Sequence, residues 1–214
     1  MTVENRTSNE IPLIIYLNPG LKITSIEIDQ KNESFTRENQ AILLDKKLKL
    51  GEKYDISINY EGGIDNAVCF LDVPSEKYNS PGVNNFGIYH YGYTPAFCEE
   101  EYKLLTPECI WYPVCVPPYS TSGCREVHFT RYSLKVEHSP HLTAISQGNV
   151  VEEGEGKTSF TLYHDMPGIS LCVGNYKRQV INVDSVRVEL YYLPRHGYLA
   201  EKYGFPQDKL AKKF

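Results

Sequence analysis

Apolar and polar residues alternate along several short stretches of the chain, and each stretch ends at turn-forming residues. The segment 54–60 (YDISINY) carries an apolar or aromatic residue at every second position and is followed by Gly62 and Gly63. The segment 186–192 (VRVELYY) begins with the same alternation and stops before Pro194. Because a period of two places one set of side chains on one face of a strand, both segments are predicted to be half-buried β-strands.

The stretch 126–138 (EVHFTRYSLKVEH) consists of two alternating halves that are out of phase with each other. A β-bulge or bend near Thr130 and Arg131 would explain the shift. Many short strands separated by Gly, Pro and Asn are typical of a sandwich or a twisted multi-sheet domain, so we expect an all-β core with at least about eight strands in 12–192. Further short strands are predicted at 12–16, 21–28, 67–71, 86–91, 142–146, 158–164, 169–174 and 179–183.

The last stretch, 198–214 (YLAEKYGFPQDKLAKKF), is the one segment with the composition of a helix. It holds good helix formers and few β-branched residues, and Gly204 and Pro206 are expected to divide it into two pieces. A helical stub after a β domain suggests the beginning of another domain. We therefore expect one β domain over 1–194, and a linker with the start of a truncated following domain over 195–214.

The composition is that of a globular protein. Hydrophobic residues make up 41% and charged residues 23%, which is enough apolar material for a core. The formal net charge of −5 lacks the basic surface of a nucleic-acid binder, so no nucleic-acid partner is expected. No apolar run approaches the about 20 residues that span a bilayer, so direct membrane insertion by this segment is not expected. The first residues are polar and carry no signal peptide. Any targeting segment of the natural protein would lie outside this sequence.

The sequence contains no recognisable metal or catalytic motif. The cysteines form no CxxC pair and no histidine begins an HExxH motif. His138 and His141 are spaced like ligands, but Pro140 disfavours a shared helix, which favours a turn between two strands. The cysteines are interpreted as buried thiols, with a disulfide left open as an alternative. The three that lie closest in sequence are Cys109, Cys115 and Cys124.

The segment 74–123 is the least regular part of the sequence and is rich in Pro, Gly, Tyr and Asn. Long ordered loops of this kind often carry function. Its aromatic residues, which include Trp111 and Tyr112, could line a sugar or peptide groove or form a core under the loops. The acidic run Glu99–Glu101 is either a solvated loop or a binding feature.

Several motifs follow one another along the chain in a fixed order. They are 16–23 (YLNPGLKI), 111–113 (WYP) with 117–118 (PP), 142–148 (LTAISQG), 166–176 (MPGISLCVGNY) and 192–196 (YLPRH). Their order and spacing resemble the amino-terminal domain of the aminopeptidase N family of gluzincin zinc peptidases, over most of the chain. In that family this domain is a saddle-shaped β structure that covers one side of the active site. The resemblance therefore implies saddle-shaped or sandwich-like twisted antiparallel sheets.

The resemblance also implies what this chain lacks. The family's GxMEN loop, its HExxH helix and the distant Glu of the zinc site are absent here and normally follow this region. We therefore expect no catalytic residue, no metal ligand and no cofactor in this chain, and expect it not to be an enzyme by itself. Zinc is expected only in a missing catalytic domain of the same polypeptide. That domain and a peptide substrate would be the partners of this chain.

One substrate-binding residue is implied by the resemblance. The family's amino-terminal domain lends a Gln or Glu that holds the free α-amino group of the substrate, ahead of the motif proline. Counting back from Pro113 leads to the acidic run, with Glu101 as the first choice and Glu100 as the second. The loop here lacks the family's flanking residues, although a carboxylate suits the role because charge-assisted hydrogen bonds to an ammonium are strong.

Three functions compete at this stage. The first is an accessory domain that shapes the substrate cleft of a zinc-aminopeptidase-like protein. The second is a free-standing β module that binds glycan or peptide, and the third is a structural extracytoplasmic domain of a permease. The resemblance is closest to bacterial members in which the peptidase-like region belongs to a larger, sometimes membrane-anchored protein. An extracytoplasmic or membrane-associated location through that parent is therefore expected.

Overall fold

The computed structural model describes residues 1–6, 9–65, 96–115 and 129–198. These residues form sixteen β-strands and two short 3-10 helices, and only the last two of them, Gly197 and Tyr198, are α-helical. The strand pairs with a defined register are antiparallel. The prediction of an all-β fold built from antiparallel sheets is confirmed. In the described part of the chain, no helix is long and apolar enough to cross a membrane.

The chain divides into two compact units, each assembled from three separate pieces of sequence. Unit 1 comprises Met1–Cys98, Leu105–Arg131 and His164–Ser170. Unit 2 comprises Glu99–Leu104, Tyr132–Tyr163 and Leu171–Phe214. The β domain that the sequence predicts over 1–194 therefore contains parts of both units.

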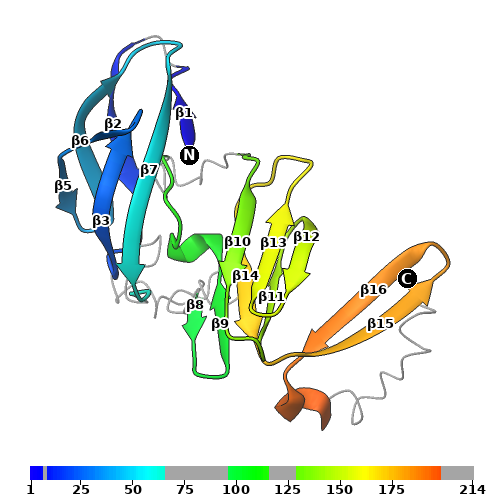
Figure 1. The fold of residues 1–214 in the computed structure, drawn as a ribbon. Coiled ribbons are helices and arrows are strands. Elements are labelled where there is room, and N and C mark those ends of the chain that lie inside the picture. Colours follow the sequence, from blue (N-terminus) through cyan, green and yellow to red (C-terminus); the bar gives the residue numbers. More distant parts are fainter. Residues whose placement is uncertain (7–8, 66–95, 116–128, 199–214) are drawn as a thin grey trace, which may run out of the picture. The chain divides into compact units, whose positions relative to one another are not determined.

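Unit 1 is a sandwich of two sheets, drawn in blue and cyan in Figure 1. One sheet has the order β1 (Thr2–Glu4), β7 (Lys53–Gly62), β3 (Leu21–Ile28) and β4 (Lys31–Asn32). The other has the order β2 (Ile11–Tyr16), β6 (Ala41–Leu48) and β5 (Phe35–Glu38). The unit also contains β8 (Ala96–Cys98) and the 3-10 helix η2 (Pro107–Cys109).

The core of unit 1 lies between these sheets. Alternate residues of each inner strand are buried, as in the pairs Leu13 and Ile15 of β2 and Ile26 and Ile28 of β3, all at most 2% exposed. Strands β6 and β7 contribute Ile42 and Ile56 to the same apolar cluster. Because side chains alternate between the two faces of a strand, each sheet packs one apolar face against the other sheet and exposes its second face to water.

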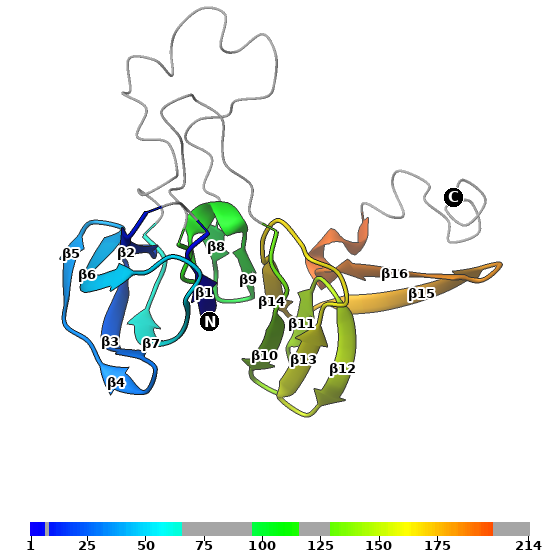
Figure 2. The ribbon, with the colours of Figure 1, turned by 90° about the horizontal axis from the view of Figure 1, so that it is seen from above.

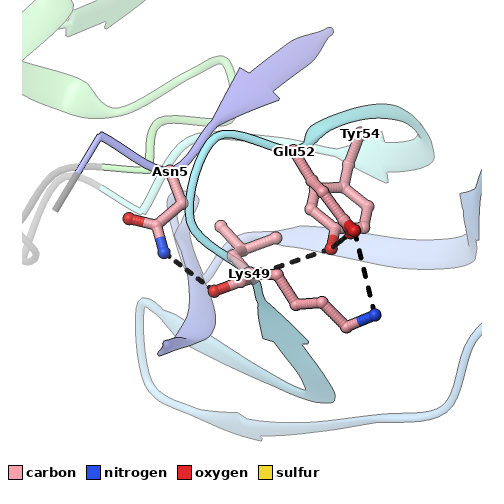
Figure 3. A network of polar contacts seen from close by, with 5 residues as sticks. Asn5, Lys49, Glu52 and Tyr54 are labelled. Atoms are coloured by element: carbon pink, nitrogen blue, oxygen red, sulfur yellow. Dashed lines mark hydrogen bonds and ion pairs between the residues drawn. The ribbon is translucent and has the colours of Figure 1, made fainter. Parts of the chain in front are cut away.

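The turn between β6 and β7 is fixed by polar contacts, shown in Figure 3. Tyr54 donates its hydroxyl to the Glu52 carboxylate at 2.5 Å, and the backbone N–H of Lys49 donates to the same hydroxyl at 3.4 Å. Gly51 adopts a φ of 74°, which L side chains rarely adopt, and its N–H donates to the Asn5 carbonyl. The buried Asn5 side chain donates in turn to the carbonyl of Leu48 at 2.8 Å.

Unit 2 contains three small sheets. Their strand orders are β10 (Ser133–Glu137), β13 (Lys157–Thr161), β12 (Asn149–Gly154); β11 (Thr143–Ser146), β14 (Leu171–Gly174), β9 (Tyr102–Leu105); and β15 (Lys177–Val183), β16 (Val186–Tyr192). The 3-10 helix η3 (Pro194–His196) follows β16. Figure 2 shows β15 and β16 as a long hairpin.

Most of the strands predicted from alternation are present. The predictions at 12–16, 21–28 and 54–60 correspond to β2, β3 and β7, and those at 142–146, 158–164, 169–174, 179–183 and 186–192 correspond to β11, β13, β14, β15 and β16. The predictions at 67–71 and 86–91, and nearly all of the helical tail at 198–214, lie outside the described residues. The sequence interpretation missed β6, β9 and β12, among others.

The strand is interrupted near Thr130 and Arg131, where the sequence predicts a β-bulge or a bend. Thr130 forms an isolated bridge with Met166, and the regular strand β10 begins only at Ser133. The boundary between the two units falls between Arg131 and Tyr132. The change of phase in 126–138 therefore marks the place where the chain leaves one unit and enters the other.

Candidate functional site

The two sequence-predicted residues, Glu100 and Glu101, lie on the exposed loop between β8 and β9. The Oε2 atom of Glu101 lies 3.1 Å from the Nη1 atom of Arg195, at the end of the chain segment that follows β16. The Arg195 guanidinium also lies over the ring of Tyr102, 5.7 Å from its centroid. The Glu101 carboxylate and the neighbouring Tyr102 ring thus form one cluster with the guanidinium of the distant Arg195 within unit 2.

The backbone of unit 2 positions this cluster. The N–H of Asn175 donates to the carbonyl of Glu101 at 3.3 Å, which ties the loop to the end of β14. Gly174 leaves room for the neighbouring aromatic rings, since a Cβ there would lie 2.9 Å from the Tyr176 ring and 3.0 Å from the Cβ of Tyr102. Close packing of β9 against β14 therefore fixes the position of the Glu101 backbone.

The electrostatics of the cluster are those of a surface ion pair. The side chains of Arg195 and Glu101 are 53% and 61% exposed. Exposed pairs of this kind contribute about 0–1 kcal/mol. The Glu101 carboxylate is therefore able to hold a cation and also to release it.

A second cluster joins two motifs of the sequence within unit 1. The indole N–H of Trp111 donates to the Ile169 carbonyl at 2.9 Å, and the Ile169 N–H donates to the Tyr112 hydroxyl at 3.1 Å. A Cβ at Gly168 would lie 2.6 Å from the Pro107 side chain. The polar atoms of both aromatic residues are thus used to hold the segment 166–170 in place, which favours the structural interpretation of these two aromatic residues over a ligand groove.

Asn18 is a residue that the alternation pattern did not single out. It is fully buried, and its Nδ2 donates to the carbonyls of Asp65 at 3.1 Å and Cys109 at 2.9 Å. Its Oδ1 accepts from the N–H groups of Gly20 at 3.0 Å and Asp65 at 2.8 Å. The Asn-Pro-Gly sequence at 18–20 is typical of a turn, and Gly20 belongs to it, but Asp65 and Cys109 lie 47 and 91 positions away along the chain.

The histidine and cysteine side chains of the described residues form no metal site. No group of three or more His, Cys, Asp or Glu residues among them could hold a metal ion. His138 and His141 lie after β10 and before β11, as the predicted turn requires. The Nε2 atom of His138 lies 3.0 Å from the Thr158 hydroxyl.

The cysteines that the structure describes are free thiols. Cys98 is exposed, Cys109 is buried, and Cys115 and Cys172 are half-buried. Cys109 and Cys115 are therefore not bonded to each other, whereas Cys124, the third cysteine of that group, lies outside the described residues. Burial raises the pKa of Cys109 and of Cys115 to about 11, which keeps both protonated at neutral pH.

Comparisons with known proteins place this geometry in context. No protein-family model matches the sequence, and no curated protein sequence matches it significantly. An M1 zinc metallopeptidase from Deinococcus radiodurans is similar in structure, with a TM-score of 0.57 and 13% identity, over 88% of this chain and 40% of that protein. A structure described as a two-domain M1 zinc metallopeptidase gives a TM-score of 0.58 at 14% identity, over 88% and 41%.

Aminopeptidase A from Legionella pneumophila, solved with aspartic acid, gives a TM-score of 0.59 at 12% identity, over 92% of this chain and 22% of that protein. The resemblance to zinc peptidases that the motifs indicated is confirmed at the level of the fold. This chain spans less than half the length of each of these three proteins.

Proposed function

We propose that this chain is the non-catalytic amino-terminal domain of a zinc-aminopeptidase-like protein, where it packs on a catalytic domain and shapes one side of the substrate cleft. The observation that carries the proposal is that the structural match includes most of this chain but less than half of the similar protein. The Deinococcus radiodurans metallopeptidase covers 88% of this chain, whereas this chain covers 40% of the metallopeptidase. The chemistry of such a protein would then belong to the remaining part, together with the zinc.

Within that function, Glu101 is proposed to hold the free α-amino group of a peptide substrate, with Glu100 as the second choice. The contact with Arg195 at 3.1 Å supports this role, because it shows that a nitrogen cation fits against the Glu101 carboxylate. A substrate ammonium would take the place of the guanidinium. The exchange costs little, since exposed ion pairs are weak, whereas the new pair would be partly desolvated by the catalytic domain and so stronger.

The first experiment addresses the domain assignment. The full-length coding sequence is read downstream of Phe214, and the encoded protein is purified with zinc and assayed on aminoacyl-coumarin substrates. We expect an HExxH helix in the following domain and turnover by the full-length protein, while residues 1–214 alone give no turnover above a heat-inactivated sample. A stop codon after Phe214, or turnover by the 214-residue chain, contradicts the proposal.

The second experiment addresses Glu101. In the full-length protein, Glu101→Ala is expected to lower kcat/KM for peptides with a free amino terminus by about 10- to 100-fold, the equivalent of a charge-assisted hydrogen bond. Peptides with an acetylated amino terminus should be unaffected. Glu137→Ala is the control, because Glu137 is an 81% exposed carboxylate of the same unit that pairs with Lys157. If neither Glu101→Ala nor Glu100→Ala reduces the preference for the free amine, the assignment is wrong.

No observation on the described residues favours a glycan- or peptide-binding module over this proposal. Trp111 and Tyr112, the aromatic side chains that could have lined such a groove, have their polar atoms engaged with Ile169. The predicted aromatic cluster also includes Phe97, which is 37% exposed, and Tyr89, Tyr91 and Tyr93, which lie outside the described residues.

A further inference from the structure

Strands β15 and β16 form a two-stranded sheet of their own among the described strands. Their register runs from Lys177 opposite Tyr192 to Val183 opposite Val186, so the pairing continues to the tip of the hairpin. Figures 1 and 2 show it as a long ribbon of two strands. A single two-stranded hairpin is marginally stable in water unless another surface packs against it.

The two faces of β16 differ in chemistry. Val186, Val188, Leu190 and Tyr192 occupy every second position and therefore share one face, which we call the valine–leucine face. Val186 is 60% exposed and Leu190 is 39% exposed, although both are apolar. The valine–leucine face thus presents a row of apolar side chains to the surroundings.

The opposite face of the hairpin carries a closed network of charges. Glu189 accepts from Arg178 at 2.5 Å and lies 2.8 Å from a guanidinium nitrogen of Arg187. The Tyr191 hydroxyl donates to the second carboxylate oxygen of Glu189 at 2.5 Å. Such a network is well accommodated in water. Strand β16 is therefore amphipathic, whereas β15 places Gln179 opposite Leu190 and the 44% exposed Val180 opposite Glu189.

We propose that the valine–leucine face is the docking surface for the domain that follows this chain in the full-length polypeptide. This inference rests on the proposed function, under which a catalytic domain follows. The similar two-domain metallopeptidase has more than half of its length outside the match, which is the material that would supply the covering surface. The hairpin is followed at once by η3, and Tyr198, the last described residue, is 57% exposed.

Hydrogen exchange tests the inference. Exchange is measured by mass spectrometry on residues 1–214 and on the zinc-loaded full-length protein. Amides of 177–192 are expected to exchange at least about tenfold more slowly in the full-length protein, because docking removes local opening. Amides of β12, whose residues are all exposed, serve as the internal control and should not change.

Substitutions identify the face. Val186→Lys and Leu190→Lys in the full-length protein are expected to return the exchange of 177–192 to the rate found in residues 1–214, since a lysine cannot be buried there without a partner. Val151→Lys is the matched control, because Val151 is a 57% exposed valine on β12 of the same unit. All three variants should leave the Tm of residues 1–214 unchanged, which shows that the fold is intact.

The outcomes separate this inference from the proposed function. A following domain without an HExxH helix contradicts the proposed function. A following zinc domain with no added protection of 177–192 contradicts only the docking surface. If residues 1–214 instead form a concentration-dependent dimer in sedimentation that Val186→Lys abolishes, the face binds a second copy of the chain and the inference is wrong.

Discussion

The Nη1 atom of Arg195 lies 3.1 Å from the Oε2 atom of Glu101, across 94 positions of sequence, and both side chains are more than half exposed. Because exposed ion pairs contribute little, we expect a double-mutant cycle of Arg195→Ala and Glu101→Ala to give a coupling of about 0.2–1 kcal/mol in the free energy of unfolding. Urea denaturation of residues 1–214 measures it. A coupling of about 3 kcal/mol would show that the pair is desolvated and would argue against exchange with a substrate ammonium.

Asn18→Ala is expected to destabilise unit 1 strongly. The substitution removes a fully buried amide and leaves the carbonyl of Cys109 and the N–H groups of Gly20 and Asp65 without this partner. The bond to the Cys109 carbonyl is buried, and a buried polar group that loses its partner costs about 1–3 kcal/mol. Urea denaturation is the measurement, and Asn59→Ala is the control because Asn59 makes an exposed bond to Ser25. Equal effects of the two changes would contradict the structural role of Asn18.

Gly168→Ala is expected to lower the Tm of residues 1–214. A Cβ at Gly168 would lie 2.6 and 2.8 Å from two side-chain atoms of Pro107, whose ring cannot move aside by rotation. Overpacking of this kind costs about 1–3 kcal/mol. Gly63→Ala is the matched control, because a Cβ there meets nothing within 4 Å. Differential scanning calorimetry compares the two variants, and an unchanged Tm for Gly168→Ala would refute the close packing.

The cysteines should differ in reactivity. With the pKa of Cys109 and Cys115 raised to about 11 by burial, only about one thiol in a thousand is ionised at pH 8, and access is restricted as well. Exposed Cys98 is expected to react with iodoacetamide in the native protein, whereas Cys109 and Cys115 react only after unfolding. Peptide mass spectrometry assigns each site. Rapid labelling of Cys109 in the native protein would contradict its burial.

The β15–β16 hairpin should weaken in acid. Hydrogen bonds from Arg178 and then from Tyr191 lower the pKa of Glu189 below its ordinary value of 4.5. The unfolded state therefore takes up the proton first, so the contribution of Glu189 is fully present above pH 4.5 and is lost as the pH falls through the lower, folded value. Hydrogen exchange of 177–192, corrected for the intrinsic rate, measures this. Glu189→Gln should remove the pH dependence, and an unchanged dependence in that variant would rule out Glu189 as its source.

The sequence predicts the strands whose two faces meet different surroundings. Strands β3 and β7 alternate because one face is more buried than the other, and their alternation is visible without a structure. Strand β16 alternates as well, but no residue of it is buried, so the expectation that 186–192 is half-buried is wrong. Strand β6 was not predicted, because its first four residues, AILL, are all apolar and show no alternation. Its residues Ile42, Leu44 and Leu48 are nevertheless buried. Strand β12 is exposed on both faces, so no hydrophobic pattern marks it.

The candidate site shows the same limit. Counting back from Pro113 leads to Glu101, but nothing in the local sequence indicates that Arg195 lies beside it. The contact between Trp111 and Ile169 joins residues 58 positions apart, and Asn18 finds Cys109 across 91 positions. Which residues become partners depends on how the strands pair in three dimensions. No local pattern of a single sequence indicates that pairing.

Each unit is assembled from three stretches of sequence, so the chain passes from one unit to the other five times. A gene fragment with a single pair of ends therefore cannot encode either unit alone. Duplication, fusion or exchange by recombination has to carry both units together, and a protein that inherits one of them inherits the other. The two compact units are thus inherited as a single module. A library of fragments of this gene should therefore yield soluble protein only from fragments that encode both units.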